Sequence, residues 1–152
     1  MPAVRLAPLP PDATLRARVG ARDFLDGYAV ETPLSAREGA RLALGMPGWA
    51  RALLRLRNAL VRPFGLRTEA PAGQDAWGLF TVEKDSADEM IFGFDDRHLD
   101  FRITFVKRGE RLHMGTWVHP HNIFGRLYLA LVMPFHVLIV RNGMAGIARA
   151  AR

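Results

Sequence analysis

The sequence predicts one domain of the α+β class, in which a curved antiparallel sheet of about five strands grips a long C-terminal helix. The chain has 152 residues, a common size for a single domain. Apolar residues recur with a helical period in the first half and at every second position over residues 78–119. Helical spacing then returns from Asn122 onward. We therefore expect two short helices after the first strand and one long helix after the sheet.

Residues 1–22 predict an extended N-terminal arm that precedes a single domain at residues 23–152. Prolines at positions 8, 10 and 11 remove backbone donors, and no helical period appears before Phe24. Side chains then alternate between two faces from Phe24 to Val30, which predicts the first strand.

Ser35 and Glu38 have the spacing of a capping box, which predicts a helix that Gly45 ends in a left-handed conformation. Pro47 suits the first turn of a second helix, expected to reach about Val61. On that helix we expect an apolar stripe to pack into the core and a basic stripe to lie on another face. The two stripes are Trp49, Leu53, Leu56 and Leu60, and Arg51, Arg55 and Arg62.

Four strands are expected at 78–84, 89–94, 98–107 and 111–119, joined by short turns as an antiparallel meander. Asn122 is a good N-cap for the last helix. Pro134 is expected to kink this helix and Asn142–Gly143 to end it. Its most apolar run, residues 127–140, is shorter than the roughly 20 residues that cross a bilayer, so we interpret it as a core helix and expect no membrane span.

Composition excludes several classes of chemistry. The chain has no cysteine, so it forms no disulfide and offers no thiolate to a metal or a substrate. Nucleotide-binding, serine-hydrolase and zinc-hydrolase motifs are absent, and no cofactor is expected.

No signal-peptide pattern opens the chain, so we expect a cytoplasmic protein. The net charge of +6 permits binding to nucleic acid or an anionic surface, but solubility is the simpler interpretation, and nucleic acid is not expected as a partner.

The densest polar cluster runs from Asp95 to Arg102. Alternation in a strand that begins at His98 places His98, Asp100 and Arg102 in one row. Such a row can bind a polar or anionic group, or let Asp100 orient His98 for proton transfer. It can equally be a row of exposed ion pairs, which would contribute little to stability.

A second cluster surrounds His119, His121 and Asn122, where the last strand meets the last helix. Two histidines alone do not make a metal site, and no metal is expected. Arg126 lies near the helix start, where the helix dipole disfavours it unless Asp95 or Asp100 pairs with it. His136 lies in an apolar run, so it is either a hydrogen-bonded core residue or a group that faces a cavity.

At these same residues the sequence resembles a bacterial family called domain of unknown function 2867, over most of the chain. The resemblance rests on three segments: 56–66, 95–102 and 121–136. It implies that the two polar clusters and the last helix are shared features of the family, and it supplies no activity. The family also occurs fused behind a reductase-like, nucleotide-binding domain, so a reductase-like partner here would act in trans. The order of elements resembles the START and plant-allergen helix-grip fold, which usually has about two more strands.

The leading hypothesis is a pocket between sheet and last helix that binds a small organic or acidic ligand. Its polar anchors would come from His98, Asp100, Arg102, His121, Arg126 and His136. The first alternative is an enzyme in which His98 or His136 acts as acid or base with Asp100 as its partner. The second is a protein-interaction module, which would expose a large apolar patch. The sequence predicts no oligomeric state.

Overall fold

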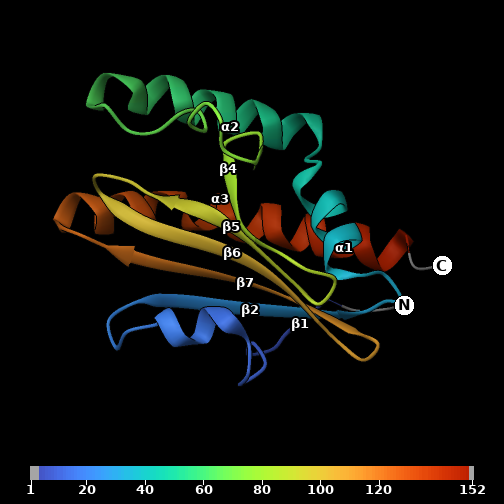
Figure 1. The fold of residues 1–152 in the computed structure, drawn as a ribbon. Helices are drawn as coiled ribbons and strands as arrows, with labels where there is room; N and C mark the ends of the chain where they lie inside the picture. The colour runs from blue at the N-terminus through green and yellow to red at the C-terminus, as the bar shows by residue number, and fades with distance from the viewer. Residues whose placement is uncertain (1–3, 151–152) are drawn as a thin grey trace.

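In the computed structural model, which describes residues 4–150, one antiparallel sheet is combined with three α-helices (Figure 1). The sheet has the strand order β1-β2-β7-β6-β5-β4-β3. Its strands are β1 (Arg5–Leu6), β2 (Phe24–Glu31), β3 (Ala76–Trp77), β4 (Phe80–Asp85), β5 (Glu89–Asp95), β6 (Leu99–Arg108) and β7 (Arg111–Pro120). The helices are α1 (Ala36–Leu44), α2 (Gly48–Val61) and α3 (Ile123–Ala150), with 3-10 turns η1 (Thr14–Arg18) and η2 (Arg62–Phe64). The predicted α+β class, with two helices after the first long strand and a long C-terminal helix, is confirmed.

The five predicted strands are present as β2, β4, β5, β6 and β7, and consecutive strands from β4 to β7 pair as a meander. Two further strands, β1 and β3, extend the edges, so the sheet has seven strands where about five were expected. Each of these edge strands has only two residues, which is too short for alternation to be visible in the sequence.

The two faces of the sheet are covered by different parts of the chain. On one face α1 and α3 pack over a core whose largest buried members include Phe92, Phe105 and Met144. On the other face the N-terminal arm inserts Leu9 and Leu15 beside Trp117. The arm was expected to be extended, but η1 and the pairing of β1 with β2 fold it against the sheet. Its first three residues lie outside the described part.

The ends of α1 and α3 differ from expectation. Ser35 and Glu38 form the predicted capping box, and Asn122 caps α3 by accepting a hydrogen bond from the Gly125 amide at 2.9 Å. Gly45 follows α1 with a φ of −75°, so the left-handed cap was wrong. The helix α3 continues past Asn142–Gly143 to Ala150. Gly143 is explained instead by packing, because a Cβ there would lie only 3.3 Å from the Cβ of Ala43 in α1.

Helix α2 stands away from the sheet and is joined to it by the long segment that leads into β3 and β4 (Figure 1). Only Ala50 and Val61 of this helix are buried. The space between α2, α3 and the sheet is the site described next.

Candidate ligand-binding cavity

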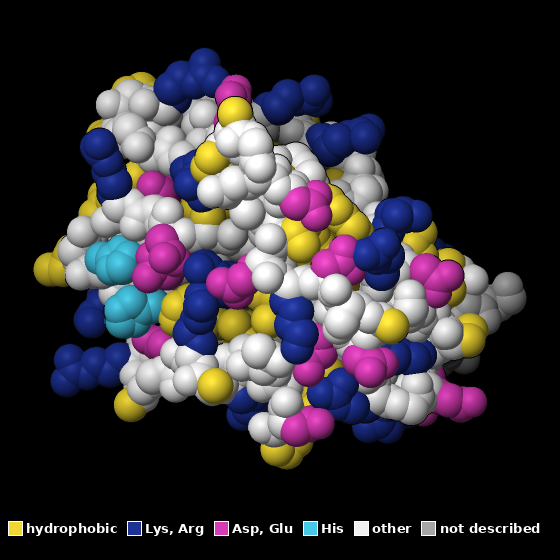
Figure 2. Space-filling model, in the orientation of Figure 1, with side chains coloured by type: hydrophobic (Ala, Val, Ile, Leu, Met, Phe, Trp, Pro, Cys, Tyr) yellow, Lys and Arg dark blue, Asp and Glu magenta, His cyan; other side chains and the backbone are white. Residues whose placement is uncertain are grey.

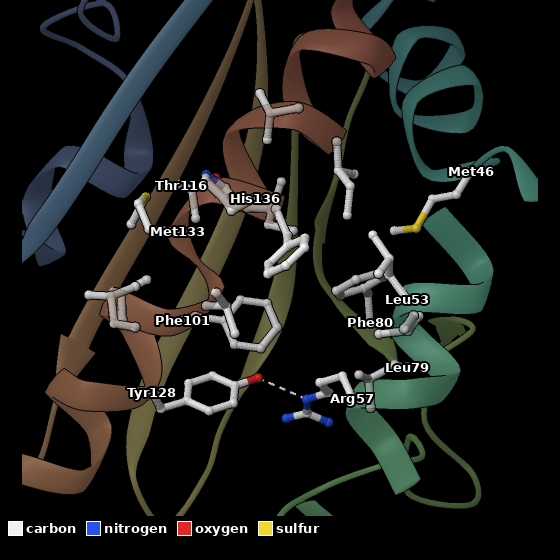
Figure 3. Close-up of a pocket in the computed structure, with 18 of the residues that line it drawn as sticks. Met46, Leu53, Arg57, Leu79, Phe80, Phe101, Thr116, Tyr128, Met133 and His136 are labelled. Atoms are coloured by element: carbon white, nitrogen blue, oxygen red, sulfur yellow. Dashed lines mark hydrogen bonds between the residues drawn. The ribbon is translucent and has the colours of Figure 1, made fainter. Parts of the chain in front are cut away.

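A cavity of about 400 Å³ lies between α2, α3 and the helix-covered face of the sheet (Figure 3). Its volume falls in the range of small-molecule sites. Strand alternation positions the sheet wall, because Phe101 and Ile103 of β6 and Met114 of β7 all point to the helix side. The wall is almost entirely apolar. Four polar side chains contribute to it: Arg57, Thr116, Tyr128 and His136.

The cavity opens to solvent between the two helices. Leu56 and Leu60 of α2, and Leu131 and Phe135 of α3, line the cavity and are also exposed. The apolar stripe of α2 was expected to pack into the core, and this was wrong for Trp49, Leu56 and Leu60, which are all exposed. Leu53, Leu56 and Leu60 of the stripe instead line the cavity, since α2 does not close against the sheet.

At one end of the cavity Arg57 of α2 and Tyr128 of α3 form a polar bridge (Figure 3). The Arg57 Nε donates to the Tyr128 hydroxyl at 2.8 Å. Its NH1 group donates to the Arg67 carbonyl at 2.6 Å and to the Asn58 side chain at 2.9 Å. All three acceptors are neutral, and no carboxylate of the described residues pairs with this guanidinium. A half-buried cation with only neutral partners favours an anion in the cavity.

A second polar group lies further along the cavity, where His136 of α3 faces β2 and β7. The His136 Nε2 lies 2.8 Å from Asp26 Oδ2, and Asp26 Oδ1 accepts a hydrogen bond from the Thr116 amide, also at 2.8 Å. Figure 3 shows the His136 and Thr116 side chains beside each other. The Thr116 hydroxyl is buried and has no hydrogen-bond partner. A buried hydroxyl without a partner on a cavity wall favours a ligand that carries a polar atom.

His98 does not belong to the predicted row of polar side chains. It precedes β6 in a turn, so strand alternation does not apply to it, and its ring packs at 4.5 Å from the Tyr128 ring of α3. Burial lowers the pKa of His98, an effect that Asp96 partly offsets and that Arg57 and His121 reinforce. Both ring nitrogens lack hydrogen-bond partners. His98 is therefore a neutral packing residue behind the Tyr128 end of the cavity.

Asp100 and His121 pair with each other outside the cavity. The His121 Nε2 lies 2.8 Å from Asp100 Oδ1, and both residues line a shallow depression that also includes Arg67, Asp95 and Arg97. His119, the neighbour of His121 in the second cluster, instead pairs with Asp23 at 2.6 Å, and this hydrogen bond raises the pKa of His119.

Arg102 lies on the face of the sheet that the arm covers, between Glu83 at 3.2 Å and Asp95 at 3.0 Å. Arg126 is exposed on α3, and neither Asp95 nor Asp100 pairs with it. The structure thus places only His136, of the six predicted anchors, in the wall of the cavity. The expected row of His98, Asp100 and Arg102 is wrong for His98, which lies in the turn, whereas Asp100 and Arg102 are alternate residues of β6 on one face.

Sequence reasoning missed Arg57, Tyr128, Thr116 and Asp26. Asp26 shares a strand face with Phe24 and Tyr28, and a lone carboxylate among apolar neighbours was a usable signal. Tyr128 is one of the residues that recur with helical spacing after Asn122, and nothing in that spacing indicates a role for its hydroxyl. Arg57 had no distinguishing pattern, because it is one of several arginines on α2.

A family model described as protein of unknown function (DUF2867) matches residues 18–143. The chain belongs to this family. The matched range covers the sheet from β2 to β7, helices α1 and α2, and α3 as far as Gly143, so it includes every polar residue of the cavity wall. No curated protein and no solved structure matches the chain.

Proposed function

We propose that this DUF2867 protein binds a small amphipathic acid in the cavity between α2, α3 and the sheet. The observation that carries the proposal is the Arg57 guanidinium, which faces an apolar cavity with only neutral partners. An apolar body would fill the space along Leu53, Phe101 and Ile103. The packing of a sheet against a long C-terminal helix agrees with a helix-grip, START-like type of binding fold, which supports the proposal by analogy alone.

The polar groups along the wall define the expected ligand. An acid group would accept hydrogen bonds from Arg57 and Tyr128, because charged hydrogen bonds in a dry site are among the strongest available. A second polar atom would satisfy the orphaned Thr116 hydroxyl near His136. The chain between these anchors would be apolar, in agreement with the rest of the lining.

The test compares two probes of equal chain length, decanoate and decanol, by calorimetric titration of the purified protein. We expect decanoate to bind more tightly. Arg57→Gln should weaken decanoate binding by about 10-fold or more, the loss of one charged hydrogen bond, and leave decanol binding unchanged. Arg55→Gln is the matched control, because Arg55 is exposed on the same helix and does not line the cavity. Equal affinity for both probes, or no binding of either, would contradict the proposal.

A second candidate function is acid–base catalysis by the His136–Asp26 pair. It is favoured by one observation: the cavity wall contains a histidine held at 2.8 Å by a carboxylate, the arrangement that orients an imidazole for proton transfer. Native mass spectrometry of freshly purified wild type and His136→Gln separates the two functions. A molecule bound to the variant but converted or absent in wild type would indicate turnover. The same bound mass in both would indicate binding alone.

A further inference from the structure

The outward side of α3 carries a long apolar surface. Five side chains recur along it at steps of four, four, four and three residues, and all of them are exposed: Ile123, Leu127, Leu131, Phe135 and Leu138. Phe124 beside them, and Leu56 and Leu60 across the cavity mouth, are exposed as well. So is Phe64, whose ring centroid lies 6.0 Å from that of Phe124. Monomeric soluble domains seldom leave so many large apolar side chains together, so this surface is expected to meet a partner.

The last helix has the length and composition of a membrane span, and only 11% of its most apolar 18-residue stretch is buried. Its C-terminal part, however, packs into the core through Met144 and Ile147. His136 is tied to β2 through Asp26. A spanning orientation would break these contacts, whereas an orientation in the plane of a membrane surface keeps them.

The charge around the apolar surface identifies the partner. Helices α2 and α3 with η2 contain seven arginines and not one carboxylate: Arg51, Arg55, Arg57, Arg62, Arg126, Arg141 and Arg149. Figure 2 shows Lys and Arg side chains along the upper edge of the molecule, over α2. An apolar strip flanked by arginines is the pattern of helices that lie at the interface of an anionic bilayer. A second copy fits less well, because a symmetric contact would bring two sets of arginines together with no carboxylates opposite them.

We propose that the outward faces of α2 and α3 bind the surface of a membrane that contains anionic lipids. The apolar side chains of α3 would enter the acyl boundary while Arg51, Arg55 and Arg126 contact headgroup phosphates. The mouth of the cavity opens in the same surface, so a membrane-bound protein would present its cavity to the lipid. The proposal does not depend on what the cavity binds.

The first experiment is sedimentation with vesicles of phosphatidylcholine alone and of phosphatidylcholine mixed with phosphatidylglycerol. We expect binding to the anionic vesicles, weakened by salt, and little binding to the neutral ones. The variant Ile123→Gln/Leu127→Gln should reduce binding at least tenfold. Neither residue lines the cavity, so decanoate binding should persist and the two proposals stay distinguishable. The control is Leu6→Gln, because Leu6 is exposed to the same 74% as Ile123 but lies on edge strand β1.

A second variant tests the charge. Replacing Arg51, Arg55 and Arg126 by glutamine should lower the affinity for anionic vesicles about fivefold for each arginine removed. The control replaces Arg22 and Arg111, which are exposed elsewhere on the protein, and should change the affinity little. Wild-type protein offers a check without mutation: the fluorescence of Trp49, which is exposed on α2 one turn before Leu53 of the cavity wall, should be quenched by brominated anionic lipid. Absence of vesicle binding and quenching would overturn the proposal. So would a dimer in sedimentation velocity that Ile123→Gln/Leu127→Gln dissociates, since the surface would then belong to a second copy.

Discussion

His98 shows what a buried histidine without hydrogen-bond partners does to stability. Its ring lies against Tyr128 and neither nitrogen is hydrogen-bonded, although Asp96 Oδ2 lies 3.9 Å from Nδ1. Burial lowers the pKa of His98 below the ordinary value of 6.5. The native state therefore binds fewer protons than the unfolded state as the pH falls through 6.5. The stability associated with neutral His98 is complete above that pH and is lost progressively below it.

We expect His98→Phe to flatten the dependence of the free energy of unfolding on pH below 6.5, as measured by urea denaturation across that range. At pH 7 the variant should lie within about 1 kcal/mol of wild type, because no hydrogen bond of the ring is lost. Some slope should remain, since burial also lowers the pKa of His113. His119→Phe should leave the slope just below pH 6.5 unchanged, because Asp23 raises the pKa of His119, so that its contribution is complete below 6.5 and is lost only as the pH rises above 6.5. An unchanged slope in His98→Phe would contradict the assignment.

The Thr116 hydroxyl is a polar group whose removal we expect to stabilise the protein in the absence of ligand. A buried hydroxyl without a partner costs about 1–3 kcal/mol, so Thr116→Val should raise the free energy of unfolding by about 1 kcal/mol. Thr104→Val is the matched control, because Thr104 is also buried, its hydroxyl donates to the Met90 carbonyl at 3.1 Å, and loss of this bond should destabilise the protein. Thermal or urea denaturation of both variants measures the difference. Destabilisation of Thr116→Val by as much as Thr104→Val would show that the hydroxyl has a partner.

At the scale of elements, Gly125 lets the start of α3 pack closely against the turn before β6. A Cβ at Gly125 would lie 2.0 Å from the carbonyl oxygen of His98, which is backbone and cannot move aside without shifting the turn before β6. We expect Gly125→Ala to cost about 2–3 kcal/mol of stability through overpacking. Gly146→Ala, in the same helix, meets nothing closer than 3.9 Å and should instead gain about 0.5–1 kcal/mol from helix propensity. Equal effects in urea denaturation would refute this packing argument.

Elements bounded by short polar turns were predictable from the sequence, and elements defined by tertiary contact were not. The strands β5, β6 and β7 begin and end within one residue of expectation, because turn segments at 85–88, 95–97 and 108–109 separate them. Gly143 signalled a helix stop, but its role is close packing against Ala43, which only the fold reveals. The apolar stripe of α2 predicted a helix correctly. The spacing of its leucines, however, does not show whether they pack against another element or line a cavity.

The candidate site was predictable in outline only. The sequence placed it between the sheet and the last helix and identified His136. It failed on the three residues of the polar row for two reasons. The row was extended into the turn that contains His98, and the polar face of β6 points to the N-terminal arm rather than to the helices, as the pairing of Arg102 with Trp117 shows. It missed Arg57 because nothing local distinguishes an arginine that faces a cavity from Arg51 or Arg55, which face solvent.

At the scale of the whole molecule, stability is expected to be uneven. The sheet and the C-terminal part of α3 share one buried core, whereas α2 buries only Ala50 and Val61 and lies across a cavity. Regions with few buried side chains open locally at a low free-energy cost. Helix α2 is therefore the part of the fold that we expect to open first.

Hydrogen exchange of the whole protein tests whether α2 is less stable than the sheet. We expect the amides of α2 to exchange at least tenfold faster than those of β6 and β7, because local opening of α2 requires less free energy than global unfolding. Arg57→Gln should accelerate exchange in α2 further and leave β6 and β7 unchanged, since it removes the hydrogen bond from α2 to Tyr128. Arg55→Gln should change neither. Decanoate at saturation should slow exchange in α2 of the wild type by bridging Arg57 and the sheet wall. Protection of α2 equal to that of β6 and β7 in the absence of ligand would mean that the helix belongs to the cooperative core.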